Sequence, residues 1–180
     1  MKRAGVLQLL RAHLALPLDA GETAMTAAAI RFVEAHADCL ERSCPAGHLT
    51  GSAWVLDPNR ERVVLTHHRK LDRWLQLGGH ADGDAKLLEV ALREAREESG
   101  LTRLRVLAEA PFDVDAHRIP ARGEVPEHWH FDLRFQMEAD PLEPLVVSSE
   151  SRDVAWVPLV DVARLNPSES MARMVRKTAR

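Results

Sequence analysis

Apolar residues follow a helical spacing through the first part of the chain. Two segments, about 3–14 and 22–38, have apolar positions three and four residues apart. Residues 16–19, Leu-Pro-Leu-Asp, separate them and read as a break, since proline disrupts a continuing helix. The pattern therefore predicts an N-terminal helical extension over residues 1–42, packed on a domain formed by residues 43–180.

From His48 onward the spacing changes to the short runs that are typical of strands. HLTGSAWVLD and RVVLTHH are separated by the turn-forming residues 57–60, so they predict a hairpin. Further strands are predicted at 103–107, 111–117, 128–137 and 153–158, and a last helix after Pro167 and Ser168. Strands interleaved with helices in one chain favour an α/β (α+β) sandwich.

One helix is sharply bounded by its end signals. Asp84 is a good N-cap, and Gly100 stands where a glycine commonly ends a helix, so a helix is predicted over 85–98. Its apolar stripe begins with Leu87 and Val90.

Composition narrows the class of protein. The chain is 46% hydrophobic and 28% charged with a net charge of −3, as in ordinary soluble globular proteins. A slightly acidic balance offers no footprint for nucleic acid, and no apolar run approaches the roughly 20 residues of a membrane span. Arg11 and His13 interrupt the N-terminal apolar run, which argues against a signal peptide. We expect a cytoplasmic protein without nucleic-acid or membrane partners. Its N-terminal helices are candidates for a lid over a pocket or for a homodimer contact.

The two cysteines, Cys39 and Cys44, make neither a disulfide framework nor a four-ligand zinc site. They are expected to be buried or incidental thiols.

Three carboxylates continue the apolar stripe of the bounded helix. Glu94, Glu97 and Glu98 fall on the same side as Leu87 and Val90. Partly buried carboxylates about 6 Å apart repel by roughly 3 kcal/mol per pair, and the helix dipole disfavours negative charge in the last turn. A solvated charged patch is the simpler interpretation. A bound divalent cation would remove both penalties, and oxygen ligands at this spacing suit Mg²⁺ or Mn²⁺.

The residues around this helix resemble a known motif. Gly79, Ala85 and the run REAREESGL at 93–101 are similar to the Nudix hydrolase signature G-x5-E-x7-R-E-U-x-E-E-x-G-U. Ala85 stands where the family has its first glutamate, and Ala95 is a small choice at the apolar position. The resemblance implies the Nudix fold, a mixed β-sheet between helices.

The resemblance also implies roles for individual residues. Glu94, Glu97 and Glu98 are expected to bind Mg²⁺ or Mn²⁺, with the main-chain carbonyl of Gly78 as a further ligand. Arg93 is expected to hold a carboxylate in place by charge-assisted hydrogen bonds.

The family's first glutamate supports that orientation, so Ala85 removes a supporting group. Asp84 next to it is a candidate substitute, and weak activity is the alternative.

The implied reaction is attack of water on a diphosphate, with a carboxylate as general base. Glu150, in the segment SSESRDVAWVPL, is the favoured base, with Glu94 or Glu97 as alternatives. The competing interpretation of Glu150 is a carboxylate on a surface loop.

The strand EHWHFDLRFQM, residues 127–137, contributes a second set of candidates. Alternation puts Trp129, Phe131, Leu133 and Phe135 on one side and His128, His130, Asp132 and Arg134 on the other. A polar row of this kind is either a solvated face or a contact surface for a phosphorylated ligand. The predicted substrate-binding residues are His80, Arg93, His128, His130, Asp132 and Arg134, and His67, His68 and His117 are further candidates.

Histidines on this strand also allow a rival kind of site. His128 and His130, with His117, could bind a transition metal.

Together these features predict a Mg²⁺-dependent hydrolase that cleaves a diphosphate linkage in a nucleoside diphosphate derivative or related small molecule. Its predicted catalytic residues are Glu94, Glu97 and Glu150. The alternatives are a catalytically weak Nudix-fold nucleotide-binding module and a hydrolase that uses a histidine-bound transition metal.

Overall fold

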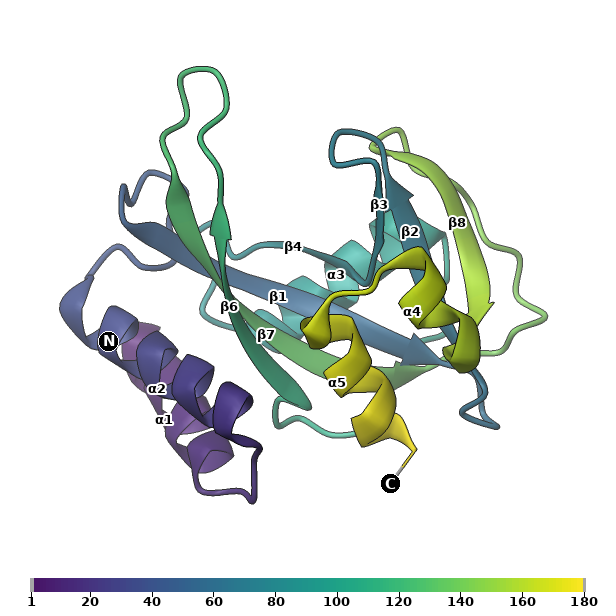
Figure 1. Cartoon of the computed structure of the whole chain (residues 1–180), viewed down its shortest axis with the longest axis horizontal. Helices are drawn as coiled ribbons and strands as arrows, with labels where there is room; N and C mark the ends of the chain where they lie inside the picture. Colours follow the sequence, from purple (N-terminus) through teal and green to yellow (C-terminus); the bar gives the residue numbers. More distant parts are fainter. Residues whose placement is uncertain (1, 180) are drawn as a thin grey trace.

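A computed structural model describes residues 2–179 of the chain. Met1 and Arg180, which the predicted domain ranges include, lie outside the described residues. One mixed sheet forms the centre, flanked by helices (Figure 1), which confirms the predicted α+β class. The strands are β1 (Gly47–Leu56), β2 (Arg62–His68), β3 (Arg73–Leu75), β4 (Leu77–His80), β5 (Arg105–Val106), β6 (Asp113–Ile119), β7 (His128–Glu138) and β8 (Ser151–Pro158). The helices are α1 (Lys2–Leu14), α2 (Ala20–Ala35), α3 (Leu87–Ser99), α4 (Val162–Leu165) and α5 (Glu169–Thr178), with a 3-10 turn, η1 (Leu159–Asp161), before α4.

The centre of the sheet is a parallel pair of long strands, β1 and β7. The main path runs β3-β2-β1-β7-β5, while β6 pairs with β7, β8 with β2, and β4 with β1. Thr50 in the first half of β1 opposes His80 of β4, and Leu56 at its end opposes Val63 of β2. One edge of β1 therefore serves two partners in succession.

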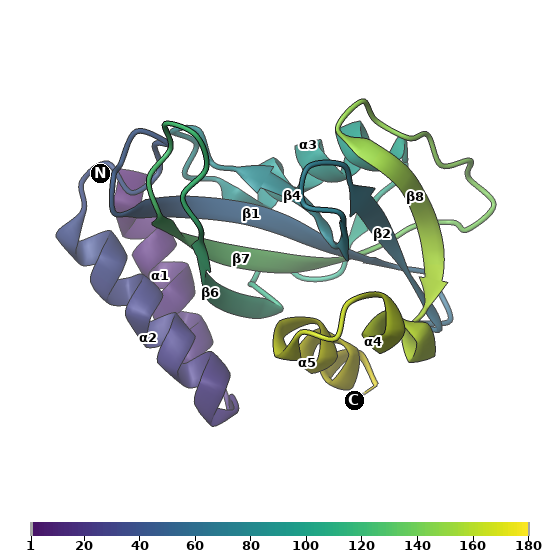
Figure 2. The same cartoon turned by 45° about the horizontal axis from the view of Figure 1, so that its top comes forward.

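Helices cover both faces of this sheet. Figures 1 and 2 show α3 on one face and α5 on the other, with α1 and α2 side by side at one end. Leu49 and Ala53 of β1 share a buried core with Val90 of α3. On the other face, Trp54 Nε1 donates a hydrogen bond to Thr178 Oγ1 of α5 at 2.9 Å.

The N-terminal helices pack on the same core. Val6 of α1 and Phe32 of α2 belong to it, and the ring of Phe32 stacks on Phe131 with centroids 4.3 Å apart. Asp19 caps α2 by accepting from the main-chain N–H of Glu22 at 2.8 Å. Within residues 2–179, no helix is both long and apolar enough to cross a membrane.

Several predicted boundaries need correction. α2 ends at Ala35 rather than near residue 38, and the strands β3 and β4 and the short helix α4 were not predicted. α3 begins at Leu87, two residues later than predicted, because Asp84 accepts a hydrogen bond from the main-chain N–H of Lys86 at 2.9 Å and so caps a turn before the helix. Gly100 ends α3 in the left-handed conformation, with φ of 75°, as predicted.

The alternation predicted along residues 128–137 is present in β7. Phe131 and Leu133 enter the apolar core. Asp132 lies on the other face, where its Oδ1 accepts hydrogen bonds from Thr50 Oγ1 at 2.8 Å and Ser52 Oγ at 2.7 Å. The polar row is therefore partly buried rather than solvated.

A buried ion network occupies this polar face beneath α5. Arg134 Nε donates to Asp132 Oδ2 at 2.8 Å, and Arg173 Nε donates to Asp113 Oδ2 at 2.7 Å, while both guanidinium groups also contact Asp115. Burial would by itself raise the pKa values of Asp113 and Asp115, but the neighbouring guanidinium groups outweigh it and lower both. The network joins α5 to β6 and β7.

Replacement of Arg173 tests this network. We expect Arg173→Met to lower the free energy of unfolding by about 3–5 kcal/mol, because Asp113 and Asp115 lose a buried partner. Arg176→Met is the matched control, since Arg176 pairs with Glu169 on the surface, and its effect should be close to zero. Urea unfolding followed by circular dichroism measures both variants. Equal stability of the two would contradict a stabilising role for the network.

Candidate functional site

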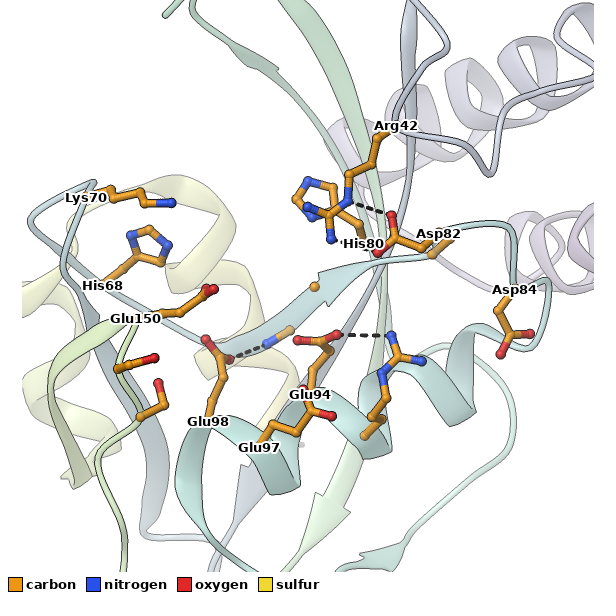
Figure 3. Close-up of a pocket in the computed structure, with 16 residues that line it drawn as sticks. Arg42, His68, Lys70, His80, Asp82, Asp84, Glu94, Glu97, Glu98 and Glu150 are labelled. Atoms are coloured by element: carbon orange, nitrogen blue, oxygen red, sulfur yellow. Dashed lines mark hydrogen bonds and ion pairs between the residues drawn. The ribbon is translucent and has the colours of Figure 1, made fainter. Parts of the chain in front are cut away.

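A cleft of about 820 Å³ opens between the end of α3, β4 and the segment before β8 (Figure 3). Carboxylates and cations both line it. The acidic residues are Asp82, Asp84, Glu94, Glu97, Glu98 and Glu150, and the basic ones are Arg42, His68, Lys70, His80 and Arg93. Such a mixture can hold a metal ion and an anionic ligand together.

Glycine allows α3 to approach β4 at this point. A Cβ atom at Gly79 would lie 2.4 Å from Cδ of Glu94, which is closer than atoms pack, so the carboxylate rests directly against the strand. Gly78 donates its main-chain N–H to Glu98 Oε2 at 2.8 Å. The double glycine thereby positions two of the α3 carboxylates.

The α3 carboxylates are poorly compensated by positive charge. Burial, together with the nearby Glu94, Glu150 and Glu97, raises the pKa of Glu98 to about 7 against the opposing hydrogen bond from Gly78. Burial also raises the pKa of Glu94, although Arg93 Nη2 contacts its Oε1 at 3.0 Å. A set of oxygen donors short of positive charge fits a hard divalent cation such as Mg²⁺ or Mn²⁺.

Two other groups of side chains face these carboxylates across the cleft. Figure 3 shows Glu150, His68 and Lys70 on one side and Arg42, His80 and Asp82 on the other. Glu150 is placed by its main-chain carbonyl, which accepts from the N–H of Arg69 at 3.0 Å. Arg42 is held by two hydrogen bonds to Asp82, one of them 2.7 Å long.

Arg42 and Lys70 were not anticipated from the sequence. Neither belongs to a recognisable motif, and each reaches the cleft from a loop that is distant from α3 in the chain. Arg42 follows α2 in the N-terminal extension, so that extension contributes a cation to the cleft.

The predicted substrate-binding residues divide into three groups. His80 and Arg93 line the cleft. Asp132 and Arg134 lie instead in the buried ion network beneath α5.

The remaining histidines also separate. His128 and His130 lie beside the cleft. The ring centroid of His130 is 5.1 Å from that of His80. His68 lines the cleft, whereas His67 contacts Asp72 and His117 contacts Asp115.

The departure at residue 85 has a plain structural setting. Ala85 packs against the apolar core, and Asp84 accepts from the main-chain N–H of Lys86. Arg93 contacts Glu94 directly. The orientation of Glu94 therefore rests on Arg93 and on the close approach of Gly79.

The site is thus a set of helix carboxylates placed against a glycine pair in an α+β domain, an arrangement of oxygen donors that can hold a divalent cation. The family model described as the NUDIX domain matches residues 48–178, and the chain belongs to the Nudix hydrolase family. This match confirms the resemblance seen in residues 79–101. Arg42 lies outside the matched residues although it lines the cleft.

Solved structures share the fold at low sequence identity. An Ap4A hydrolase of C. elegans, in a binary complex, is 16% identical with a TM-score of 0.59 over 73% of this chain and 94% of that one. A NUDIX-family hydrolase of Clostridium perfringens is 21% identical with a TM-score of 0.58 over 73% and 96%. The NUDIX domain of Shewanella oneidensis NrtR, complexed with ADP ribose, is 17% identical with a TM-score of 0.51 over 73% and 85%. No curated protein sequence matches the chain.

A methyl group at Gly79 tests how tightly the carboxylates are placed. We expect Gly79→Ala to lower Mn²⁺ affinity at least 10-fold while the protein stays folded, because the added carbon would displace Glu94. Gly5→Ala in α1 is the control, since the added carbon would meet nothing within 4 Å. Isothermal titration calorimetry with Mn²⁺ compares them, and unchanged affinity in Gly79→Ala would refute the tight placement.

Proposed function

We propose that this chain hydrolyses a diphosphate linkage in a nucleoside diphosphate derivative or related small molecule, with Mg²⁺ or Mn²⁺ bound by Glu94, Glu97 and Glu98. The observation that supports it most strongly is that these poorly compensated carboxylates share one cleft with the basic side chains of Arg42 and Lys70. The family match supports the hydrolase class.

The charges of the cleft suit a diphosphate only when a cation is present. Carboxylates alone would repel phosphate oxygens. When bound, a divalent cation neutralises phosphate charge and makes a coordinated water more acidic. Arg42 presents a guanidinium that is already oriented by Asp82, and Lys70 presents an ammonium from the opposite wall. Phosphate oxygens would contact both.

Each carboxylate has a separate task in this proposal. Glu98 is fixed by the N–H of Gly78, and Glu94 by Arg93, so both are oriented before a ligand arrives. Glu150 lies on the side of the cleft that carries His68 and Lys70, and it accepts the proton of the attacking water. Glu94 and Glu97 are the alternative bases. The carbonyl of Gly78 remains a proposed metal ligand.

Names of the structural neighbours agree with a phosphoanhydride substrate. They include an Ap4A hydrolase, a dihydroneopterin triphosphate pyrophosphohydrolase of E. coli and a domain bound to ADP ribose. All three ligands contain linked phosphates, whereas their organic parts differ. The neighbours therefore support the reacting group and leave the organic part open to a screen.

Glu98→Gln tests the metal-dependent reaction. We expect the rate of diphosphate cleavage, followed by the phosphorylated products, to fall at least 100-fold, because the metal loses a charged ligand. The assay screens nucleoside diphosphate sugars, dinucleoside polyphosphates, nucleoside triphosphates and coenzyme A esters with Mg²⁺ or Mn²⁺. Glu89→Gln is the matched control, since Glu89 is an exposed glutamate in the first turn of the same helix.

Full activity in Glu98→Gln would overturn the assignment of the acidic helix. A wild-type protein that binds nucleotides but turns over no diphosphate would favour the nucleotide-binding module.

Glu150→Gln tests the general base. We expect kcat to fall by roughly 10²–10⁴-fold with Mn²⁺ affinity unchanged, because the variant keeps the α3 ligands but cannot take the proton. Glu124→Gln, in the exposed turn between β6 and β7, is the control. Single-turnover kinetics and Mn²⁺ titration measure the two quantities. An unchanged kcat would transfer the role to Glu94 or Glu97.

A further inference from the structure

Four histidines gather on the sheet beside the cleft. They come from three neighbouring strands: His48 from β1, His80 from β4, and His128 and His130 from β7. His48 is in register with His130, and their ring centroids are 4.6 Å apart. Gly79 faces Glu94 of α3, so the next residue, His80, points to the opposite face, where its ring lies 4.9 Å from that of His48.

His48 is unsatisfied at the centre of this cluster. It is only 4% exposed, and within residues 2–179 neither of its ring nitrogens has a hydrogen-bond partner. A buried polar group without a partner costs about 1–3 kcal/mol, and native proteins rarely leave one unexplained. The nitrogens of His48 therefore indicate a ligand that binds imidazole.

The hydrogen bonds of His128 direct a lone pair toward its neighbour. Nδ1 of His128 donates to the carbonyl oxygen of Pro126 at 2.9 Å, which leaves Nε2 of the neutral ring without a proton. That Nε2 lies 3.2 Å from Nε2 of His130. Two imidazole nitrogens bound to one tetrahedral zinc at about 2.0–2.1 Å would be about 3.4 Å apart. Without a metal this contact is a hydrogen bond in which Nε2–H of His130 donates to His128, and its length is close to the separation of two ligands on one ion.

Two of these imidazoles, His48 and His130, favour the neutral form near physiological pH. Burial, with the neighbouring histidines, lowers the pKa of His48 to about 4 and that of His130 to about 2. Neutral imidazole is the form that binds metals.

We propose that His48, His128 and His130 form a second metal site, for a first-row transition-metal dication such as Zn²⁺. One ring nitrogen from each of the three lies within 4.8 Å of the others. Nitrogen ligands favour zinc, cobalt, nickel or copper over magnesium, so this site differs in chemistry from the oxygen-lined cleft. It is independent of the proposed hydrolysis.

The site also borders the cleft. His80 packs against His48 and His130 and lines the cleft as well. It is therefore the candidate for a fourth ligand, with water as the alternative.

Zinc titration of the full chain tests this proposal. The wild-type protein, stripped with a chelator, is titrated with ZnCl₂ by calorimetry, and Co²⁺ replaces zinc for visible absorption. We expect tetrahedral Co²⁺ bands and one zinc equivalent that His128→Gln and His130→Gln each weaken by at least 100-fold, more than loss of an outer-shell partner usually costs. His117→Gln is the matched control, because His117 is bonded to Asp115 instead.

A second group of side chains could also bind zinc, so its binding must be distinguished from binding at the histidine cluster. His36, Asp38 and Cys44 have ligand atoms close enough to hold an ion. All titrations are therefore done in a Cys44→Ser background as well, and Glu98→Gln removes a ligand of the acidic cleft. The proposed equivalent should persist in both.

The proposal is overturned if zinc binding disappears in Cys44→Ser or Glu98→Gln, or if it survives in both His128→Gln and His130→Gln. Circular dichroism of each metal-free variant checks the fold. His128 is only half-buried near the start of β7, so its variant keeps the test decisive even if replacement of His130 disturbs the strand.

Discussion

The close approach of α3 to β4 is the constraint on which the site depends. A Cβ at Gly79 would lie 2.4 Å from Cδ of Glu94, so only a residue without a side chain there lets the helix end sit on the strand. A Cβ at Gly78 would instead lie 2.3 Å from Ser52 Oγ of the neighbouring strand β1. Strand β4 then donates its main-chain N–H to Glu98 and turns the next side chain, His80, to the opposite face. One dipeptide thereby positions the acidic cleft and borders the histidine cluster.

Buried carboxylates have pKa values shifted in opposite directions on the two faces of the sheet. Beneath α5, Asp113 and Asp115 meet two guanidinium groups, and their pKa values fall. Beside α3, Glu98 meets other carboxylates and a single main-chain N–H, and its pKa rises to about 7. Burial acts in the same direction in both places, so the difference comes from the partners. The aspartates beneath α5 are paired with cations and stabilise the fold. The glutamates of α3 have too little positive charge near them, which a bound cation can supply.

The sequence prediction succeeded where a local pattern determines the structure, and it failed where contacts between distant segments do. Glu94 and Glu98 were found because the i, i+4 spacing of a helix fixes their common side, and Gly100 was found because ending a helix requires a left-handed residue. β4 was missed, since its glycines have no apolar alternation and it forms only by pairing with β1. Arg42 was missed for a similar reason, because no periodic pattern links a loop after α2 to a cleft beside α3.

Ala85 illustrates how a motif can change without losing the geometry around it. In the structure, residue 85 precedes α3 and packs on the core, so its side chain serves the fold. The side chain of the neighbouring Asp84 accepts a hydrogen bond from the main-chain N–H of Lys86. Glu94 is nevertheless oriented by Arg93, which it contacts at 3.0 Å, and it packs directly against Gly79. Relative to the family motif, what the substitution removes is one carboxylate, and in this structure Arg93 pairs with Glu94. The departure from the motif thus leaves in place the two contacts that orient Glu94.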